Sequence, residues 1–170
     1  MSLVVEDGSG KSNADAYVSL EDCDGYHADM GNAAWVVDDE DADNVAARET
    51  AIRKATAFMD RRYGGRFKGR RAMKAQALLW PRSEASDEDG FTLDDVPAAV
   101  KYATCEAALR AFQGVELLPD MERGGQVISE TIGPISTTYA AGAPSGTRYD
   151  MIEGLLRPCI EGRGLKLVRS

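Results

Sequence analysis

Residues 45–63, which read VAARETAIRKATAFMDRRY, carry the pattern that decides the fold. Apolar side chains recur in this stretch at the three- and four-residue spacing of a helix, at Val45, Ile52, Ala55, Phe58 and Met59. Charged side chains face away from that stripe, at Arg48, Glu49, Arg53 and Lys54. The pattern predicts an amphipathic helix over 45–63, with Asp43 or Asn44 as its N-cap and an end at Gly64-Gly65.

Shorter signals on either side predict the remaining elements. Ser19 is a suitable N-cap, with Asp22 three residues on, for a helix that runs to about Met30. A short helix is expected over 72–79, before Pro81. A longer helix should begin at an Asp94 or Asp95 N-cap, with Pro97 in its first turn, and end at Gly114. A last helix is expected over 147–157. β-Branched runs at 126–132 and 135–139 predict a hairpin. The fold class is mainly α: a small helical bundle with one β-hairpin and a short N-terminal strand at 14–18.

Length and composition describe one globular domain. The chain has 170 residues, 44% of them hydrophobic and 28% charged, so it can bury a core without cross-links. No apolar run approaches the roughly 18 residues of a membrane span, and the first residues lack the pattern of a signal peptide. Three widely spaced cysteines favour a reducing, intracellular compartment. We expect a flexible N-terminal segment at 1–13, a single helical domain at 14–160 and a tail at 161–170.

The charge is negative overall and unevenly distributed. Twenty Lys and Arg stand against 28 Asp and Glu, a net charge of -8, which argues against a protein coated with nucleic acid. Acidic residues gather at 38–43 and 84–95. Between these runs lies a basic strip of seven cations: Arg61, Arg62, Arg66, Lys68, Arg70, Arg71 and Lys74.

The basic strip has three possible uses. Its cations interleave with Tyr63 and Phe67, a composition suited to phosphates and stacked bases. It is equally suited to docking on an acidic protein surface, including an acidic run of a second copy, and this interpretation is favoured. The third possibility is a solvated loop.

Residues that could perform chemistry are few. Gly8-Ser9-Gly10-Lys11-Ser12 resembles the end of a phosphate-binding loop, but Val5 stands where that motif requires its first glycine. The expected structure is a plain flexible loop. His27 is the single histidine and has no nucleophile placed beside it, so we expect a partly exposed helical histidine.

The cysteines do not change this conclusion. Cys23, Cys105 and Cys159 are too far apart for ligand spacing, and they are expected to be core thiols. The sequence therefore predicts no enzyme, no catalytic residue, no metal site and no cofactor.

Two segments keep alternative interpretations. The tail at 162–169 carries three apolar and three basic residues, and it either frays or orders as a short peptide against a partner. The hairpin either covers the core or projects and pairs edge to edge with the hairpin of a neighbouring copy.

Several segments, taken in order, resemble one known family. They are ADAYVSL at 14–20, GNAAW at 31–35, AFMDRRY at 57–63, FKGRR at 67–71, QALLWPR at 76–82, VPAAVKYATCE at 96–106 and GPISTTY at 133–139. The ordered set, which covers about residues 14–157, resembles the small head–tail connector (adaptor) proteins of tailed bacteriophages. Members of this group are also labelled DnaT-like single-stranded-DNA-binding proteins.

The resemblance implies a structural virion protein without catalytic residues or cofactor. Such connectors assemble as a ring, commonly a dodecamer, beneath the portal at the head–tail interface, after assembly in the host cytoplasm. Double-stranded DNA passes through the ring without sequence-specific binding, and the partners are the portal and the next connector or tail-terminator protein. The resemblance assigns portal docking to C-terminal residues, which here are Arg163, Leu165, Lys166, Leu167, Val168 and Arg169.

Two other functions stay open beside the connector. The family label suggests a single-stranded-DNA-binding replication accessory protein, for which the negative net charge and the aromatic content of 7% are unfavourable. A toxin or regulator that uses the basic strip to dock on a host protein is a third, weaker interpretation.

Overall fold

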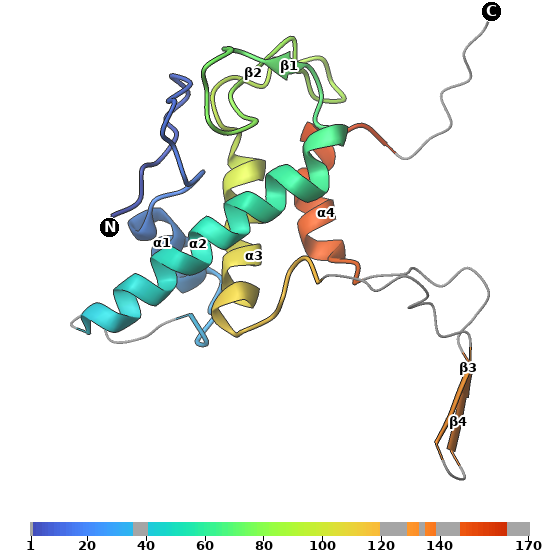
Figure 1. The fold of residues 1–170 in the computed structure, drawn as a ribbon. Coiled ribbons are helices and arrows are strands. Elements are labelled where there is room, and N and C mark those ends of the chain that lie inside the picture. Colours follow the sequence, from blue (N-terminus) through green and yellow to red (C-terminus); the bar gives the residue numbers. More distant parts are fainter. Residues whose placement is uncertain (1, 36–40, 120–128, 133–134, 139–146, 163–170) are drawn as a thin grey trace, which may run out of the picture.

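The computed structural model describes residues 2–35, 41–119, 129–132, 135–138 and 147–162. Four helices form its body: α1 (Leu20–Asp29), α2 (Ala42–Tyr63), α3 (Ala98–Phe112) and α4 (Asp150–Leu156). Helix α3 packs against the other three, and the long α2 crosses it (Figure 1). Two 3-10 turns follow helices, η1 (Gly64–Arg66) after α2 and η2 (Arg157–Cys159) after α4.

Two short antiparallel sheets complete the structure. Strands β1 (Arg70–Arg71) and β2 (Arg82–Ser83) pair within the long connection between α2 and α3. Strands β3 (Ser129–Ile132) and β4 (Ile135–Thr138) form a hairpin that Figure 1 draws apart from the helices. The predicted fold class, mainly α with one hairpin, is confirmed, and the expected N-terminal strand is a single parallel bridge between Val5 and Ala16.

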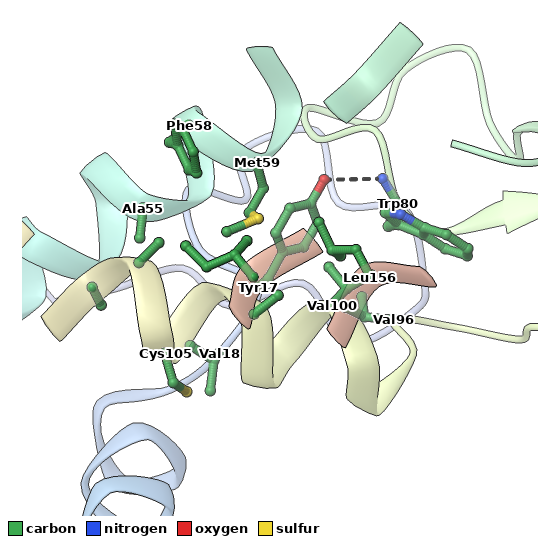
Figure 2. Close-up of a cluster of buried hydrophobic side chains, with 14 of the residues drawn as sticks. Tyr17, Val18, Ala55, Phe58, Met59, Trp80, Val96, Val100, Cys105 and Leu156 are labelled. Atoms are coloured by element: carbon green, nitrogen blue, oxygen red, sulfur yellow. Dashed lines mark hydrogen bonds between the residues drawn. The ribbon is translucent and has the colours of Figure 1, made fainter. Parts of the chain in front are cut away.

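One continuous core lies between the helices. Its largest fully buried side chains come from α2, α3, α4 and the loops before α1 and after β1 (Figure 2), and they include Tyr17, Ile52, Phe58, Met59, Trp80, Val100 and Leu156. Figure 2 shows the α2 side chains Ala55, Phe58 and Met59 directed to the centre, where Tyr17 lies. The predicted apolar stripe of α2 is thus the side that packs on the rest of the protein.

Helix boundaries agree with the sequence where a local cap sets them. The Ser19 hydroxyl accepts a hydrogen bond from the Asp22 amide (3.0 Å) and begins α1, as predicted. Helix α2 begins three residues earlier than predicted because Asp41 is its cap, accepting from the Asp43 amide (2.9 Å). Helix α3 has no capping side chain, because Pro97 rather than an aspartate occupies its N-cap position.

One residue of α2 lies on the opposite side from the prediction. The Arg48 side chain is buried, and its Nη1 donates to Asp24 Oδ1 at 2.9 Å. The same carboxylate oxygen accepts from Trp35 Nε1 at 2.6 Å. A charge this deep requires a partner, and Asp24 joins α1, α2 and the Trp35 loop.

The helix predicted over 72–79 is absent, because backbone groups of this segment bond elsewhere, several of them to one buried side chain. Gln76 is buried, and its Nε2 donates to the carbonyls of Leu78 (2.8 Å) and Pro81 (3.0 Å). Its Oε1 accepts from the Met73 amide at 2.7 Å. These three bonds satisfy backbone groups in turns, so this segment has no need of helical hydrogen bonds.

The N-terminal residues are more ordered than the predicted flexible segment. The Val4 amide donates to Asp15 Oδ1 (2.7 Å), and the Glu6 amide donates to the Ala16 carbonyl (2.9 Å). Farther along, the Ala77 amide donates to the Lys11 carbonyl at 2.9 Å. Residues 2–13 are therefore held against both the start of α1 and the 72–79 loop.

Gln76→Ala should lower the free energy of unfolding by about 1–3 kcal/mol, because it removes the Gln76 donor from the buried Leu78 carbonyl and one of two donors from the Pro81 carbonyl. Lys74→Ala, an exposed neighbour in the same loop, should change it by less than about 0.5 kcal/mol. Urea unfolding followed by circular dichroism measures both. Equal values for the two variants would show that Gln76 does not organise the loop.

Candidate interaction surface

The basic strip follows one continuous stretch of chain from the last turn of α2 through η1 to β1 and the loop beyond. Five of its cations are exposed: Arg61, Arg62, Arg70, Arg71 and Lys74. Lys68 is half-buried. Within the part of the chain that the structure describes, ion pairs involve Arg66 and Arg70 but none of the other five members.

Arg66 differs from its neighbours because it is used inside the molecule. Its Nη1 donates to Glu153 Oε1 at 2.8 Å, and its Nε donates to the Glu161 carbonyl at 3.3 Å. These bonds tie η1 to α4 and to the residues after η2. Arg66 therefore has a structural role within the fold, although its position in the sequence places it in the basic strip.

Arg70 forms a surface pair across the small β1–β2 sheet. Its Nη2 lies 2.5 Å from Glu84 Oε1, and both side chains are about two-thirds exposed. An exposed pair of this kind contributes about 0.2–1 kcal/mol. It leaves Arg70 accessible to a partner.

The aromatic residues of the strip do not lie on the surface. Tyr63 is 3% exposed and Phe67 5% exposed. Phe67 meets Trp80 edge to face, and Tyr63 meets Phe58 in the same way. The expectation that these rings interleave with cations for base stacking is wrong: the strip presents positive charge without a stacking platform.

An acidic loop lies next to the strip in the chain, as predicted, at residues 84–95. Asp87 organises its tip, because Asp87 Oδ1 accepts from the amides of Asp89 (3.0 Å) and Phe91 (2.8 Å). The Asp87 amide donates in turn to the Phe91 carbonyl at 2.9 Å. Phe91 is held at this tip with 72% of its surface exposed. In the other acidic run, 38–40 lie outside the described residues.

A groove, which the sequence did not reveal, lies between α2 and the segment after α3. Its volume is about 460 Å³. One helix face of α2 supplies Lys54, Ala57, Phe58 and Arg61, and the opposite wall consists of Ala111 and residues 114–118. The sequence feature that could have indicated the groove is the pair of apolar residues Val115 and Leu118 directly after the helix, and both are partly exposed in the structure.

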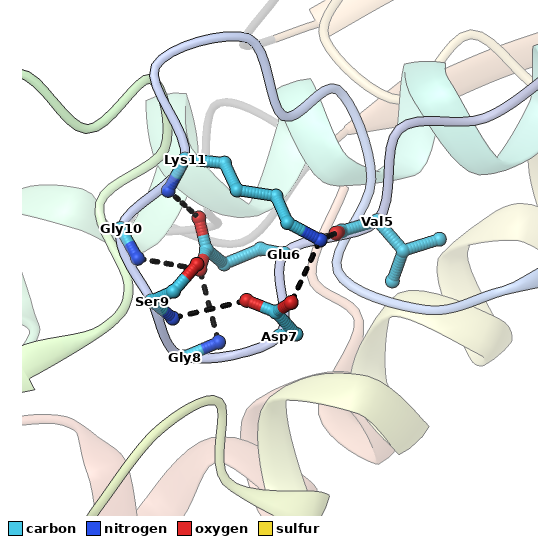
Figure 3. A network of polar contacts seen from close by, with 7 residues as sticks. All are labelled: Val5, Glu6, Asp7, Gly8, Ser9, Gly10 and Lys11. Atoms are coloured by element: carbon cyan, nitrogen blue, oxygen red, sulfur yellow. Dashed lines mark hydrogen bonds and ion pairs between the residues drawn. The ribbon is translucent and has the colours of Figure 1, made fainter.

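The Gly8–Lys11 loop does gather backbone N–H groups, but around a carboxylate of its own. The amides of Gly8 (2.9 Å), Gly10 (2.8 Å) and Lys11 (2.8 Å) all donate to the buried Glu6 carboxylate (Figure 3). Lys11 Nζ donates to the Val5 carbonyl and pairs with Asp7, both at 2.8 Å. The donors that a phosphate would need are already used, so this loop is an ordered internal cap.

His27 is buried, which contradicts the expected partial exposure. Its Nδ1 lies 3.0 Å from Asn32 Nδ2 and its Nε2 lies 3.1 Å from the Cys105 carbonyl. Because the amide donates and the carbonyl accepts, the ring carries its proton on Nε2 and is neutral. Burial lowers the pKa of His27 from its ordinary value.

The three cysteines are buried free thiols, as predicted. Burial raises the pKa of Cys159 to about 11, and hydrogen bonding to Cys105 together with burial raises the pKa of Cys23. A thiol with a raised pKa is a poor nucleophile at neutral pH. The described residues contain no group of three or more metal-ligating side chains, and no described helix is long and apolar enough to cross a membrane.

These observations define a helical protein whose described surface offers charged and apolar contacts. Comparison with known families then gives a more particular identification. The chain belongs to the family described as "Putative DnaT-like ssDNA binding protein", whose sequence model matches residues 1–170. By its description this is a binding family and not an enzyme family. Neither the curated proteins nor the solved structures contain a match to the chain.

The residues assigned to portal docking are not placed by the structure. All six, Arg163, Leu165, Lys166, Leu167, Val168 and Arg169, lie outside the described residues.

The stability of the protein should fall as the pH is lowered from 7 to 5. The unfolded chain protonates its single histidine near pH 6.5, whereas the folded His27 has a lowered pKa and stays neutral. The contribution of the neutral His27 to the free energy of unfolding is thus fully present above pH 6.5. It is lost toward acid pH, by at most about 1.4 kcal/mol per pH unit. Urea titrations at several pH values measure it, and His27→Gln should flatten the dependence between pH 7 and 5. An unchanged slope in that variant would contradict the assignment.

Proposed function

We propose that this chain is a structural connector at the head–tail interface of a tailed bacteriophage, where copies of it form a ring beneath the portal. The single observation that carries the proposal is the nature of the basic strip. It presents cations while its rings are in the core, so it is suited to contacts with a charged surface and not to base stacking.

The second support is that the same small body carries a surface of opposite sign. A ring of identical copies needs two different, complementary faces on each copy. The acidic loop at 84–95 is mostly exposed and follows β2, whereas the cations Arg61 and Arg62 are exposed on the last turn of α2. They offer such a pair of faces.

The third support comes from the overall charge and the ordered resemblance to connector proteins. A subunit with a net charge of -8, repeated around a channel, repels DNA from the wall and allows its passage. In this proposal the partners are further copies, the portal, the next connector or tail-terminator protein and the DNA in transit, and the protein resides in the virion.

The connector proposal predicts a large homo-oligomer, or a monomer that assembles at high concentration or on its portal. Light-scattering mass across a concentration series, with and without the portal protein of the same phage, measures this, and electron microscopy shows whether the particles are rings. A chain that stays monomeric throughout and never binds the portal would contradict the proposal.

The second candidate function is binding of single-stranded DNA, which the family description favours directly. On this surface it would act through phosphate contacts by the exposed cations. Arg66 is excluded from this role because it braces α4. The residues to test are therefore Arg62, Arg71 and Lys74.

If the strip binds single-stranded DNA, Arg62→Ala, Arg71→Ala and Lys74→Ala together should weaken binding and reduce the salt slope of log K by about 0.7 for each phosphate that the variant no longer neutralises. Fluorescence anisotropy with a labelled oligonucleotide at several salt concentrations measures this. Arg157→Ala, an exposed cation outside the strip, is the control. Retained binding with an unchanged slope in the triple variant would remove the strip as a DNA site.

A further inference from the structure

The most exposed large apolar side chain of the described residues is Phe91. It is not on a loose loop, because Asp87 binds its amide and carbonyl and the bridge between Ser86 and Thr92 closes the turn behind it. A loop whose backbone is already held in one shape loses little conformational freedom when a partner covers its tip. An aromatic ring at such a tip is typical of an anchor at the centre of an interface.

The loop that carries this ring is rich in carboxylates. They lie on both sides of Phe91 in the chain, at Glu84, Asp87, Glu88, Asp89, Asp94 and Asp95. Two of the six form exposed ion pairs, Glu84 with Arg70 at 2.5 Å and Glu88 with Arg157 at 3.3 Å, which leaves a net negative charge on the loop. A partner for Phe91 therefore needs an apolar hollow with positive charge at its edge.

The groove beside α2 has this character. Its apolar lining includes Phe58 and Leu117, both buried, and the half-buried Ala57. Lys54 and Arg61 are exposed on the same face of α2, seven residues apart, and within the described residues neither forms an ion pair. Glu116 contributes one carboxylate to the lining, so two positive charges oppose one negative charge.

The two features cannot meet within one chain. Phe91 precedes α3, whereas the second wall of the groove follows it, and the 15 residues of α3 span about 22 Å. The segment before α3 and the segment after it leave opposite ends of this helix (Figure 1). Contact between them requires a second copy. The resulting pair still has an unoccupied Phe91 side chain on one copy and an unoccupied groove on the other.

We propose that Phe91 and its acidic loop dock into the groove between α2 and residues 114–118 of a neighbouring copy. This inference rests on the proposed assembly function and names its interface. A contact of this kind is heterologous, with a different surface on each copy, so it propagates into a ring when its rotation closes.

Phe91→Ala should weaken self-association roughly thirtyfold, the effect expected for loss of an aromatic anchor. Analytical ultracentrifugation from micromolar to millimolar concentration measures the effect. The side chain is exposed, so the variant should keep the circular dichroism and melting temperature of the original chain. Met30→Ala removes another large apolar side chain, 52% exposed at the C-cap of α1, and should leave association unchanged.

The groove is tested by reversing the charge of the two cations that line it. Lys54→Glu with Arg61→Glu should abolish association, because it sets two carboxylates against the acidic loop. Lys101→Glu with Arg148→Glu is the matched control, since it makes the same total charge change at two cations outside both the groove and the basic strip.

Mixing the two defective variants gives the sharpest result. The Phe91→Ala variant keeps an intact groove, and the double charge variant keeps an intact Phe91 side chain. An equimolar mixture should therefore form one-to-one dimers and nothing larger. Assembly of the original chain that survives both variants would overturn this interface while leaving the connector proposal intact. A groove variant that loses only portal binding would overturn it also, since the groove would then hold the portal. A chain that is monomeric to millimolar concentration and does not bind the portal would overturn both.

Discussion

The arrangement of the molecule depends on one buried hydrogen-bond network around the Tyr17 hydroxyl. This hydroxyl donates to the Asp60 carboxylate on α2 and accepts from the amides of Leu79 (3.1 Å) and Trp80 (3.2 Å). Figure 2 shows the bond from Trp80 reaching Tyr17 in the middle of the core. Asp60 Oδ2 also accepts from the Leu79 amide at 3.1 Å. Burial raises the pKa of both Tyr17 and Asp60, so the hydroxyl keeps its proton. The network fixes the N-terminal segment and the 79–81 loop on α2.

This attachment explains why the charged surface sits on a rigid base. The acidic loop and the basic strip from Arg66 onward belong to the connection between α2 and α3, whose own regular structure is the turn η1 and two short paired strands. Trp80 and Phe67 anchor that connection in the core. Gly69 makes the close pairing possible: at a φ of +68°, a side chain there would meet the Ser83 carbonyl at 2.3 Å. The backbone of this long connection is thus anchored in the core at Phe67 and Trp80 and closely paired at Gly69.

Local signals in the sequence were sufficient for the helices, and non-local contacts decided what they missed. The apolar period of α2 and the Ser19 cap of α1 depend on residues within one or two turns, so they could be predicted from spacing alone. The turn at 72–79 depends on Gln76 bonding to Pro81 across several residues, and its local composition resembles that of a helix. His27 is buried because Asn32 and Cys105 complete its hydrogen bonds, and Cys105 is 78 residues away. Charge clusters were visible in the sequence, whereas the direction of Tyr63 and Phe67 was not, because the same residues read equally well as an exposed stacking surface.

The direction of those two rings also separates the candidate functions in physical terms. Proteins that bind single strands without sequence preference gain about 1–3 kcal/mol per base from stacking on exposed aromatic side chains. In the described part of this protein the exposed large aromatic side chains are Phe91, which lies among carboxylates that repel phosphates, and Tyr102 on α3. Neither ring belongs to the basic strip, so the cations of the strip and the accessible rings come from different segments. That separation disfavours a stacking groove for nucleic acid and is what an interface between unlike faces of identical copies requires.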